Sequence, residues 1–91
     1  MSVGIDLHFD AARYPLTLHE ASVLHDLLDD MASAAAHELA ALIRAEVMFR
    51  PQPRLTLNPN DVAILRSALC NELLIRFPGL EAIRTVLCAA A

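Results

Sequence analysis

Lysine is absent from the 91-residue sequence, and all seven cationic side chains are arginine. Without lysine the chain cannot form a Lys-dependent phosphate loop, a Schiff base or a Ser–Lys nucleophile pair. Glycine occurs only at Gly4 and Gly79, which excludes a glycine-rich dinucleotide-binding fingerprint. The net charge is −4 and the arginines are scattered, apart from three around a Pro-containing connector at 50–54, so we expect no nucleic-acid partner.

Long apolar runs and targeting signals are also missing. The longest Ala-rich segment, residues 32–43, carries His37 and Glu38, so we expect no transmembrane helix and no membrane partner. The first ten residues lack the basic start and apolar core of a secretory signal peptide. Cys70 and Cys88 lie among apolar residues at helical spacing, and we interpret them as buried reduced thiols. Together these features predict a cytoplasmic protein.

The apolar content is high for so small a chain. Hydrophobic residues make up 56% of the sequence, and the mean hydropathy is +0.44. Residues 1–91 are expected to form a single small domain, whose surface is too large for its volume to hide so many apolar side chains. Exposed apolar patches usually mark interaction sites, so we expect a homodimer or another protein as partner. The composition, rich in Ala, Arg and Leu, indicates a GC-rich bacterial or phage genome.

The first half of the chain shows a strand pattern followed by a helix pattern. Residues 3–9 alternate strictly between apolar and polar positions, which predicts a half-buried strand. Residues 14–18 predict a short second strand at a sheet edge, because proline at position 15 has no amide donor. Thr17 and Glu20 match a capping box, and one long helix is expected from there to about Phe49. A break within residues 31–38 is the alternative, because few large side chains hold the helix straight there.

Prolines then divide the second half of the chain. The Arg-Pro-Gln-Pro-Arg segment at 50–54 ends the long helix, and residues 55–57 predict a short extended segment. Asn58 and Pro59 are suited to the cap and first position of a helix whose apolar face extends to Leu73 and Ile75. Phe-Pro-Gly at 77–79 separates it from a last helix. The prediction is an α+β fold that is predominantly helical, with an N-terminal strand or hairpin, one long helix, an extended segment and two helices.

The triplet Leu-Thr-Leu occurs twice, at 16–18 and at 55–57, each time before a helix with an acidic residue in its first turn. One interpretation is a weak internal repeat that relates residues 9–49 to 49–91. The other is that an extended triplet before a helix cap recurs by chance. Under either interpretation, the two triplets and the first strand are expected to form a small sheet under the helices.

An apolar stripe along the predicted long helix suggests how the protein functions. Its members recur at helical spacing and are Leu24, Leu28, Met31, Ala35, Leu39 and Leu42. We expect this stripe to contact either a second copy of the chain or the C-terminal helices. The primary prediction is therefore a non-catalytic protein–protein interaction module that forms a homodimer through its helices.

The densest polar cluster, His-Asp-Leu-Leu-Asp-Asp at 25–30, supports an alternative function. His25 and Asp29 are four residues apart, as are Asp26 and Asp30, so all four lie within about one turn of a helix. Such an acidic face is suited to a small inhibitor of a basic target, such as an immunity protein, an antitoxin or a defence antagonist. Metal sites on helices usually need ligands from a second helix, so we predict no metal.

A metal- or Cys-dependent enzyme is the second alternative. The four serines and four histidines include no nucleophile elbow, and none stands beside a plausible base in the sequence. The pair His37–Glu38 lacks the second histidine of a zinc-protease helix. A thiol at Cys70 meeting a histidine in space is not required by anything in the sequence. We therefore predict no catalytic residue and no cofactor.

Overall fold

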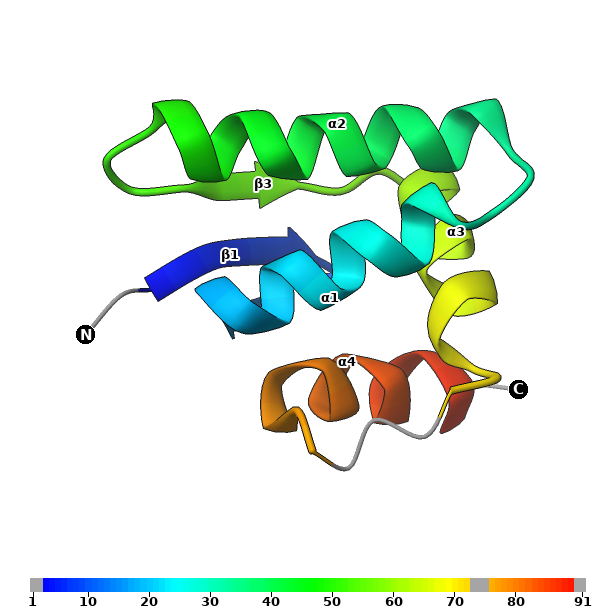
Figure 1. The fold of residues 1–91 in the computed structure, drawn as a ribbon. Coiled ribbons are helices and arrows are strands. Elements are labelled where there is room, and N and C mark those ends of the chain that lie inside the picture. The colour runs from blue at the N-terminus through cyan, green and yellow to red at the C-terminus, as the bar shows by residue number, and fades with distance from the viewer. Residues whose placement is uncertain (1–2, 73–75, 90–91) are drawn as a thin grey trace.

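A computed structural model describes residues 3–72 and 76–89 of the protein (Figure 1). It contains a three-stranded sheet and four helices in this part of the chain, which confirms the predicted, predominantly helical α+β fold. In chain order the elements are β1 (Val3–Phe9), β2 (Ala12–Thr17), α1 (Leu18–Asp29), α2 (Ala34–Phe49), β3 (Arg54–Thr56), α3 (Pro59–Leu69) and α4 (Pro78–Ala89).

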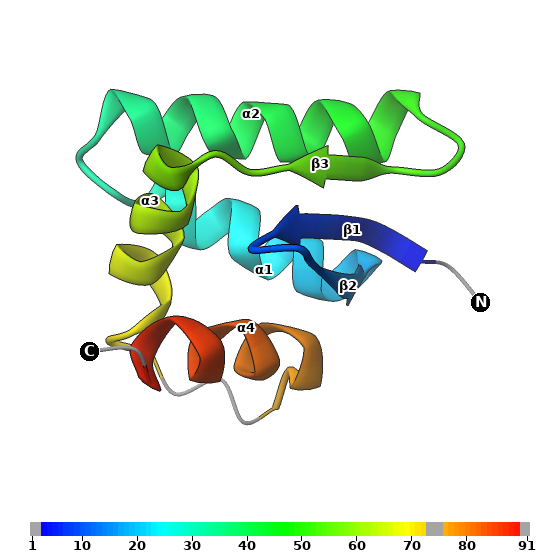
Figure 2. The same cartoon turned by 180° about the vertical axis from the view of Figure 1, so that it is seen from behind.

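The sheet has the strand order β2-β1-β3, with β2 antiparallel and β3 parallel to β1. It joins the first strand to the two segments that contain the Leu-Thr-Leu triplets, and β2 is an edge strand, as its proline predicted. The alternation along β1 buries Ile5, Leu7 and Phe9 while Asp6 and His8 stay partly exposed on the opposite face. In Figures 1 and 2, α1 covers the apolar face of the sheet, so these strands form one wall of the core.

The hairpin between β1 and β2 is tighter than the sequence indicated. Only Asp10 and Ala11 connect the strands, both with positive φ (52° and 59°), so β2 begins at Ala12 rather than near residue 14. Two consecutive residues with positive φ are typical of a type I′ turn, in which Gly or Asn is usually preferred. The rings of Phe9 and Tyr14 stack across the hairpin with centroids 4.5 Å apart, which helps to offset the cost of this turn.

The prediction of one continuous helix from residue 18 to 49 is wrong. The chain turns at residues 30–33, inside the region where a break was the alternative, and α2 runs back beside α1 (Figure 1). Ser33 caps the new helix, because its Oγ accepts a hydrogen bond from the backbone N of Ala36 at 3.3 Å. Folding back lets the apolar faces of both helices enter one core, which a straight helix of this length cannot achieve within one small domain.

The start of α3 matches the prediction, but its end does not. Asn58 caps the helix, its Oδ1 accepting from Asp61 N at 2.8 Å, and Pro59 occupies the first position. The helix ends at Leu69, earlier than its apolar pattern predicted, and Asn71, a weak helix former, follows the C-cap. The pattern also assigned Leu73 and Ile75 to this helix, and both lie outside the described residues.

One hydrophobic core joins the sheet to all four helices. Its largest fully buried side chains are Ile5, Leu7, Leu16, Leu24, Leu28, Leu39, Ile43, Leu65, Leu69, Leu80, Ile83 and Leu87. Most of them lie at the period-2 or helical spacing that the sequence showed. The core therefore draws on segments from both halves of the chain.

A single buried carboxylate, that of Glu20, caps two helices at once. Glu20 is 5% exposed; its Oε1 accepts from the backbone N of Thr17 at 3.0 Å, which completes the predicted capping box of α1. Its Oε2 accepts from the backbone N of Gly79 at 2.6 Å and of Leu80 at 3.4 Å, in the first turn of α4. Both helix N-termini present free donors and a partial positive charge, which favour a carboxylate. A Cβ at position 79 would lie 2.7 Å from Glu20 Oε1, so glycine permits this close approach.

Replacing this carboxylate should loosen both helices. We expect Glu20→Gln to lower the free energy of unfolding by about 1–3 kcal/mol, because the amide group places donors against backbone donors and removes the charge. Urea denaturation followed by circular dichroism measures the loss. Glu72→Gln, at an exposed position, is the matched control and should change stability little. Equal midpoints for the two variants would contradict the assigned role of Glu20.

Candidate protein-binding face

The structure divides the predicted apolar stripe between the core and the surface. Leu24, Leu28 and Leu39 are fully buried inside the protein, Met31 is half-buried, and only Ala35 and Leu42 are exposed. The turn between α1 and α2 explains this division, because it directs the buried leucines toward the sheet and the other helices. The six residues therefore do not form one continuous exposed surface, and the buried ones contact elements of the same chain.

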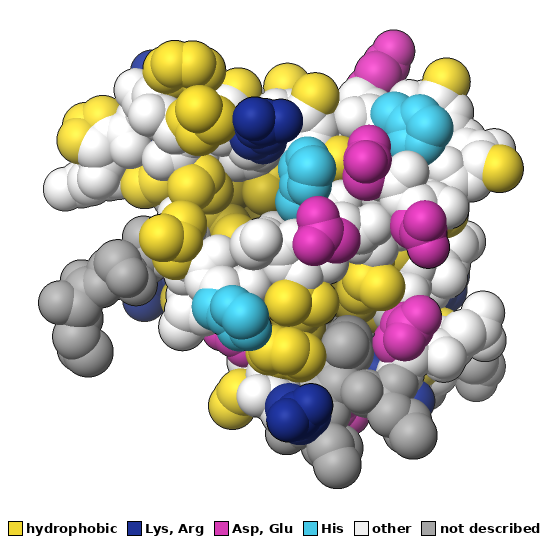
Figure 3. Space-filling model, in the orientation of Figure 1, with side chains coloured by type: hydrophobic (Ala, Val, Ile, Leu, Met, Phe, Trp, Pro, Cys, Tyr) yellow, Lys and Arg dark blue, Asp and Glu magenta, His cyan; other side chains and the backbone are white. Residues whose placement is uncertain are grey.

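Exposed apolar side chains instead surround a groove between the start of α1 and the end of α2. The groove has a volume of about 380 Å³ and is lined by Leu18, Ala21, Ser22, His25, Ile43, Arg44, Val47 and Met48. Leu18 is 49% exposed and Met48 is 59% exposed. Figure 3 shows hydrophobic side chains gathered around a hollow on this face, at the upper left of the view. The sequence pattern did not single out this region.

Helical spacing explains why these side chains meet. Leu18, Ser22, His25 and Asp29 recur at steps of four, three and four residues, so they lie along one side of α1. Since α2 runs in the opposite direction to α1, the start of α1 lies beside the end of α2, where Met48 is found (Figure 1). The groove is therefore apolar at this end and becomes polar toward the end of α1.

The predicted acidic residues lie at that polar end. Asp26, Asp29 and Asp30 are all exposed, and His25 belongs both to the acidic cluster and to the groove wall. The spacing of four residues suggested a contact between His25 and Asp29. In the structure, His25 Nδ1 lies 3.4 Å from Asp26 Oδ1 instead. The Asp26 side chain is 80% exposed, so this contact contributes little to stability. The structure thus brings the acidic cluster and the apolar groove onto one face.

The C-terminal part of α2 exposes apolar side chains that the stripe analysis did not use. Ala41, Ala45, Met48 and Phe49 are all exposed there, and of these four only Met48 lines the groove. A helix that is apolar around most of its circumference is normally covered on every side. Phe49, at 77% exposure, is the most exposed of the large apolar side chains in the described chain.

Two further kinds of feature were sought in the described residues: a cluster of potential metal ligands and a membrane-spanning helix. Within residues 3–72 and 76–89, no group of three or more His, Cys, Asp or Glu side chains is placed to hold a metal ion. In the same ranges, none of the helices has the length and apolar character needed to cross a membrane.

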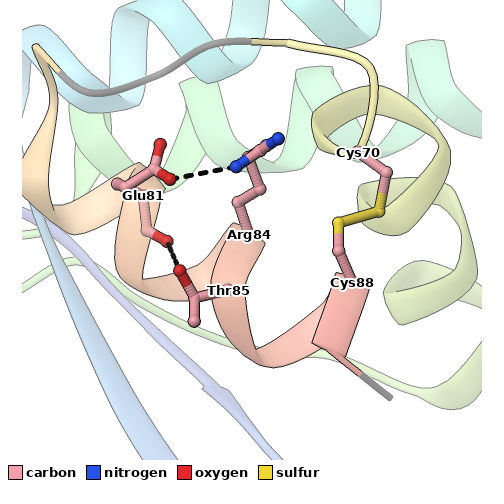
Figure 4. Close-up of a disulfide and its surroundings, with 5 residues drawn as sticks. All are labelled: Cys70, Glu81, Arg84, Thr85 and Cys88. Atoms are coloured by element: carbon pink, nitrogen blue, oxygen red, sulfur yellow. Dashed lines mark hydrogen bonds and ion pairs between the residues drawn. A yellow bond between two sulfur atoms is a disulfide. The ribbon is translucent and has the colours of Figure 1, made fainter. Parts of the chain in front are cut away.

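The interpretation of the two cysteines as reduced thiols is wrong. Cys70 and Cys88 form a disulfide with Cα atoms 5.9 Å apart, which joins the C-cap of α3 to the last turn of α4 (Figure 4). The pattern of apolar neighbours did not reveal it, because the packing of α4 against α3 brings the two sulfurs together. A disulfide sulfur is not a free nucleophile, so the Cys-dependent alternative loses its candidate residue. Disulfides are rare in the cytosol, so the cysteines no longer support a cytoplasmic location.

The partition of the stripe can be tested with two leucines of equal size. We expect Leu28→Ala to lower the free energy of unfolding by about 2–5 kcal/mol, because it leaves a cavity in the core. Leu42→Ala, at a position 50% exposed, should change it by about 0.5 kcal/mol or less. Urea denaturation of both variants gives the comparison, and similar losses would show that the assigned burial is incorrect.

The disulfide should contribute measurably to stability. Cys70 and Cys88 are 18 residues apart, and closing a loop of this length in the unfolded chain is worth about 3 kcal/mol. A Cys70→Ser/Cys88→Ser variant should lose about that amount in a denaturant titration. Alkylation of the unfolded, unreduced wild type followed by mass spectrometry should detect no free thiol, and modification of both cysteines would refute the pairing.

The sequence and structure were compared with known proteins. Neither the protein-family models, the curated proteins nor the solved structures that were compared include a match to this chain. The face between α1 and α2 is therefore assigned from its own geometry: an apolar groove that continues into three exposed aspartates.

Proposed function

We propose that the protein is a non-catalytic protein–protein interaction module and that the face between α1 and α2 is its binding surface. The observation that carries this proposal is the open groove whose rim exposes about half of each of two large apolar side chains, Leu18 and Met48. Large apolar side chains gathered around a hollow are a common feature of protein-binding surfaces.

The core is well filled without the side chains at the rim of the groove, which supports the same proposal. The protein already buries large side chains from its sheet and from each helix, so its fold does not depend on the apolar groups at the rim. Both walls of the groove are helices that pack directly on this core, which fixes their spacing. A groove with rigid walls loses little conformational entropy when a partner binds.

The partner is a second copy of the chain or another protein. A homodimer is the first candidate, because the sequence has more apolar residues than a small chain can bury. We now place its contact surface at the groove and not at the stripe. A small inhibitor of a basic target is the second candidate, and the exposed Asp26, Asp29 and Asp30 beside the groove favour it. The bacterial or phage origin remains a prediction from composition, and the cytoplasmic location remains a prediction from the missing apolar runs and targeting signals.

Site-specific photocrosslinking in the producing cell tests the proposal. A photoreactive residue at position 48 should give a discrete protein adduct, and Leu18→Glu in the same protein should suppress it, because a charge at the rim opposes apolar contact. Position 86 is the matched control, since Val86 is also an exposed apolar residue but lies on α4 outside the groove lining. Light scattering shows whether an adduct of twice the mass corresponds to a dimer of the 9.9 kDa chain.

Adducts that form equally at positions 48 and 86, or at neither, would contradict the proposal. The Leu18→Glu protein must retain the unfolding midpoint of the wild type for the comparison to count. This is expected, because Leu18 is half exposed at the first position of α1 and is not part of the core.

A further inference from the structure

We infer that the groove between α1 and α2 binds an amphipathic helix of another protein, whose basic residues reach Asp26, Asp29 and Asp30. The inference rests on the proposed function and adds the chemistry of the partner. An amphipathic helix in a hydrophobic groove is a recurring mode of protein recognition, in which apolar residues at i, i+3 or i+4 and i+7 act as anchors.

The shape and lining of the groove suit a helix. Its walls are two helices packed side by side, and a third helix placed along them completes a common packing arrangement. Ala21 and Ser22 are small, so a partner helix can approach α1 closely between the larger Leu18 and Met48. The groove volume of about 380 Å³ accommodates a few apolar side chains of a partner.

Charge complementarity supplies the second argument. Asp29 stands four residues after His25, which lines the groove. Asp26 lies in the last turn of α1, and Asp30 is the C-cap of that helix. Across the described part of the chain, no arginine lies within ion-pair distance of these aspartates, and the only imidazole near them is that of His25, 3.4 Å from Asp26. Asp26 and Asp30 repel each other at a spacing of four residues. Basic groups of a partner would relieve this repulsion.

The same charges disfavour a second copy as the occupant. An isologous dimer places one surface against itself. The three aspartates would then have only Arg44 of the groove lining as a cationic counterpart. Figure 3 shows acidic side chains and histidines to the right of the hollow, with a cationic side chain at its edge. The face therefore has an excess of negative charge that a foreign basic segment complements better than this chain does.

Arg44 also determines where the basic residues of the partner belong. It lines the α2 wall of the groove one turn before Met48, on the side toward the aspartates. A basic partner residue at this level would face a like charge. The fitting helix is therefore apolar over the turns that lie in the groove and basic only where it passes Asp26 and Asp29.

A designed peptide provides the test. The probe is a fluorescein-labelled helix of about 18 residues, with leucines at i, i+3, i+4 and i+7 in one half and three arginines in the other. Its matched partner carries glutamates in place of the arginines. Anisotropy titrations with the full-length, disulfide-bonded protein should show binding of the arginine peptide that weakens with added salt, because exposed charges are screened. Amide chemical-shift changes should concentrate at the groove residues and at Asp29.

Variants of the protein test the apolar contact and the charged contact separately. Met48→Glu should abolish binding. Asp26→Asn/Asp29→Asn/Asp30→Asn should weaken binding of the arginine peptide about tenfold and remove most of its salt dependence, since three exposed pairs are lost. Asp10→Asn/Glu72→Gln, two exposed acids outside the groove lining, is the control and should change the affinity little.

Two results would overturn the inference, and they differ in their meaning for the proposed function. Equal binding of the arginine and glutamate peptides, or groove shifts that appear with protein concentration alone, would show that the occupant is apolar only or is a second copy. The proposed function would then stand without the basic partner. Absence of any shift at the groove, with peptide or with increasing protein concentration, would contradict both.

Discussion

The arrangement of this fold depends on one carboxylate that serves two helices. Glu20 closes the capping box of α1 and accepts hydrogen bonds from the backbone of Gly79 and Leu80 in the first turn of α4. A buried acid is normally costly, but here the N-termini of two helices supply its donors and favourable dipoles. This contact joins residues about 60 positions apart in the sequence and fixes where the start of α4 lies relative to α1. The disulfide between Cys70 and Cys88 fixes the other end of α4 against α3, so the helix is held at both ends.

The turn at residues 30–33 is the second constraint, and the proposed binding face follows from it. A continuous helix would have kept its apolar stripe on one exposed side. Folding back buries Leu24, Leu28 and Leu39 and places the start of α1 beside the end of α2. Leu18 and Met48, 30 residues apart in the chain, thereby become neighbours on the rim of one groove. The core takes the three leucines Leu24, Leu28 and Leu39 of the stripe, and part of the apolar surplus that so small a chain cannot bury lies at this surface.

Apolar and acidic features that the sequence suggested as separate sites belong to one face of the molecule. The groove lies at one end of α1 and the exposed Asp26, Asp29 and Asp30 at the other, with His25 between them. An apolar contact gives affinity without strong directional preference, whereas exposed charges contribute more to the choice of partner and to the rate of association. In the proposed interaction, their combination on adjacent turns of one helix would let a small surface select a partner by both shape and charge.

The sequence by itself determined the local structure of this protein. The alternation along residues 3–9, the capping pairs at Thr17 and Asn58, and the prolines around position 51 fixed most elements, because each acts within a few residues. Tertiary structure decided the features that need distant residues to meet. Those features are the break between α1 and α2, the disulfide, the second role of Glu20 and the groove itself. Periodicity shows which residues are apolar on one side of a helix, but only packing decides which of those sides the core has room to bury.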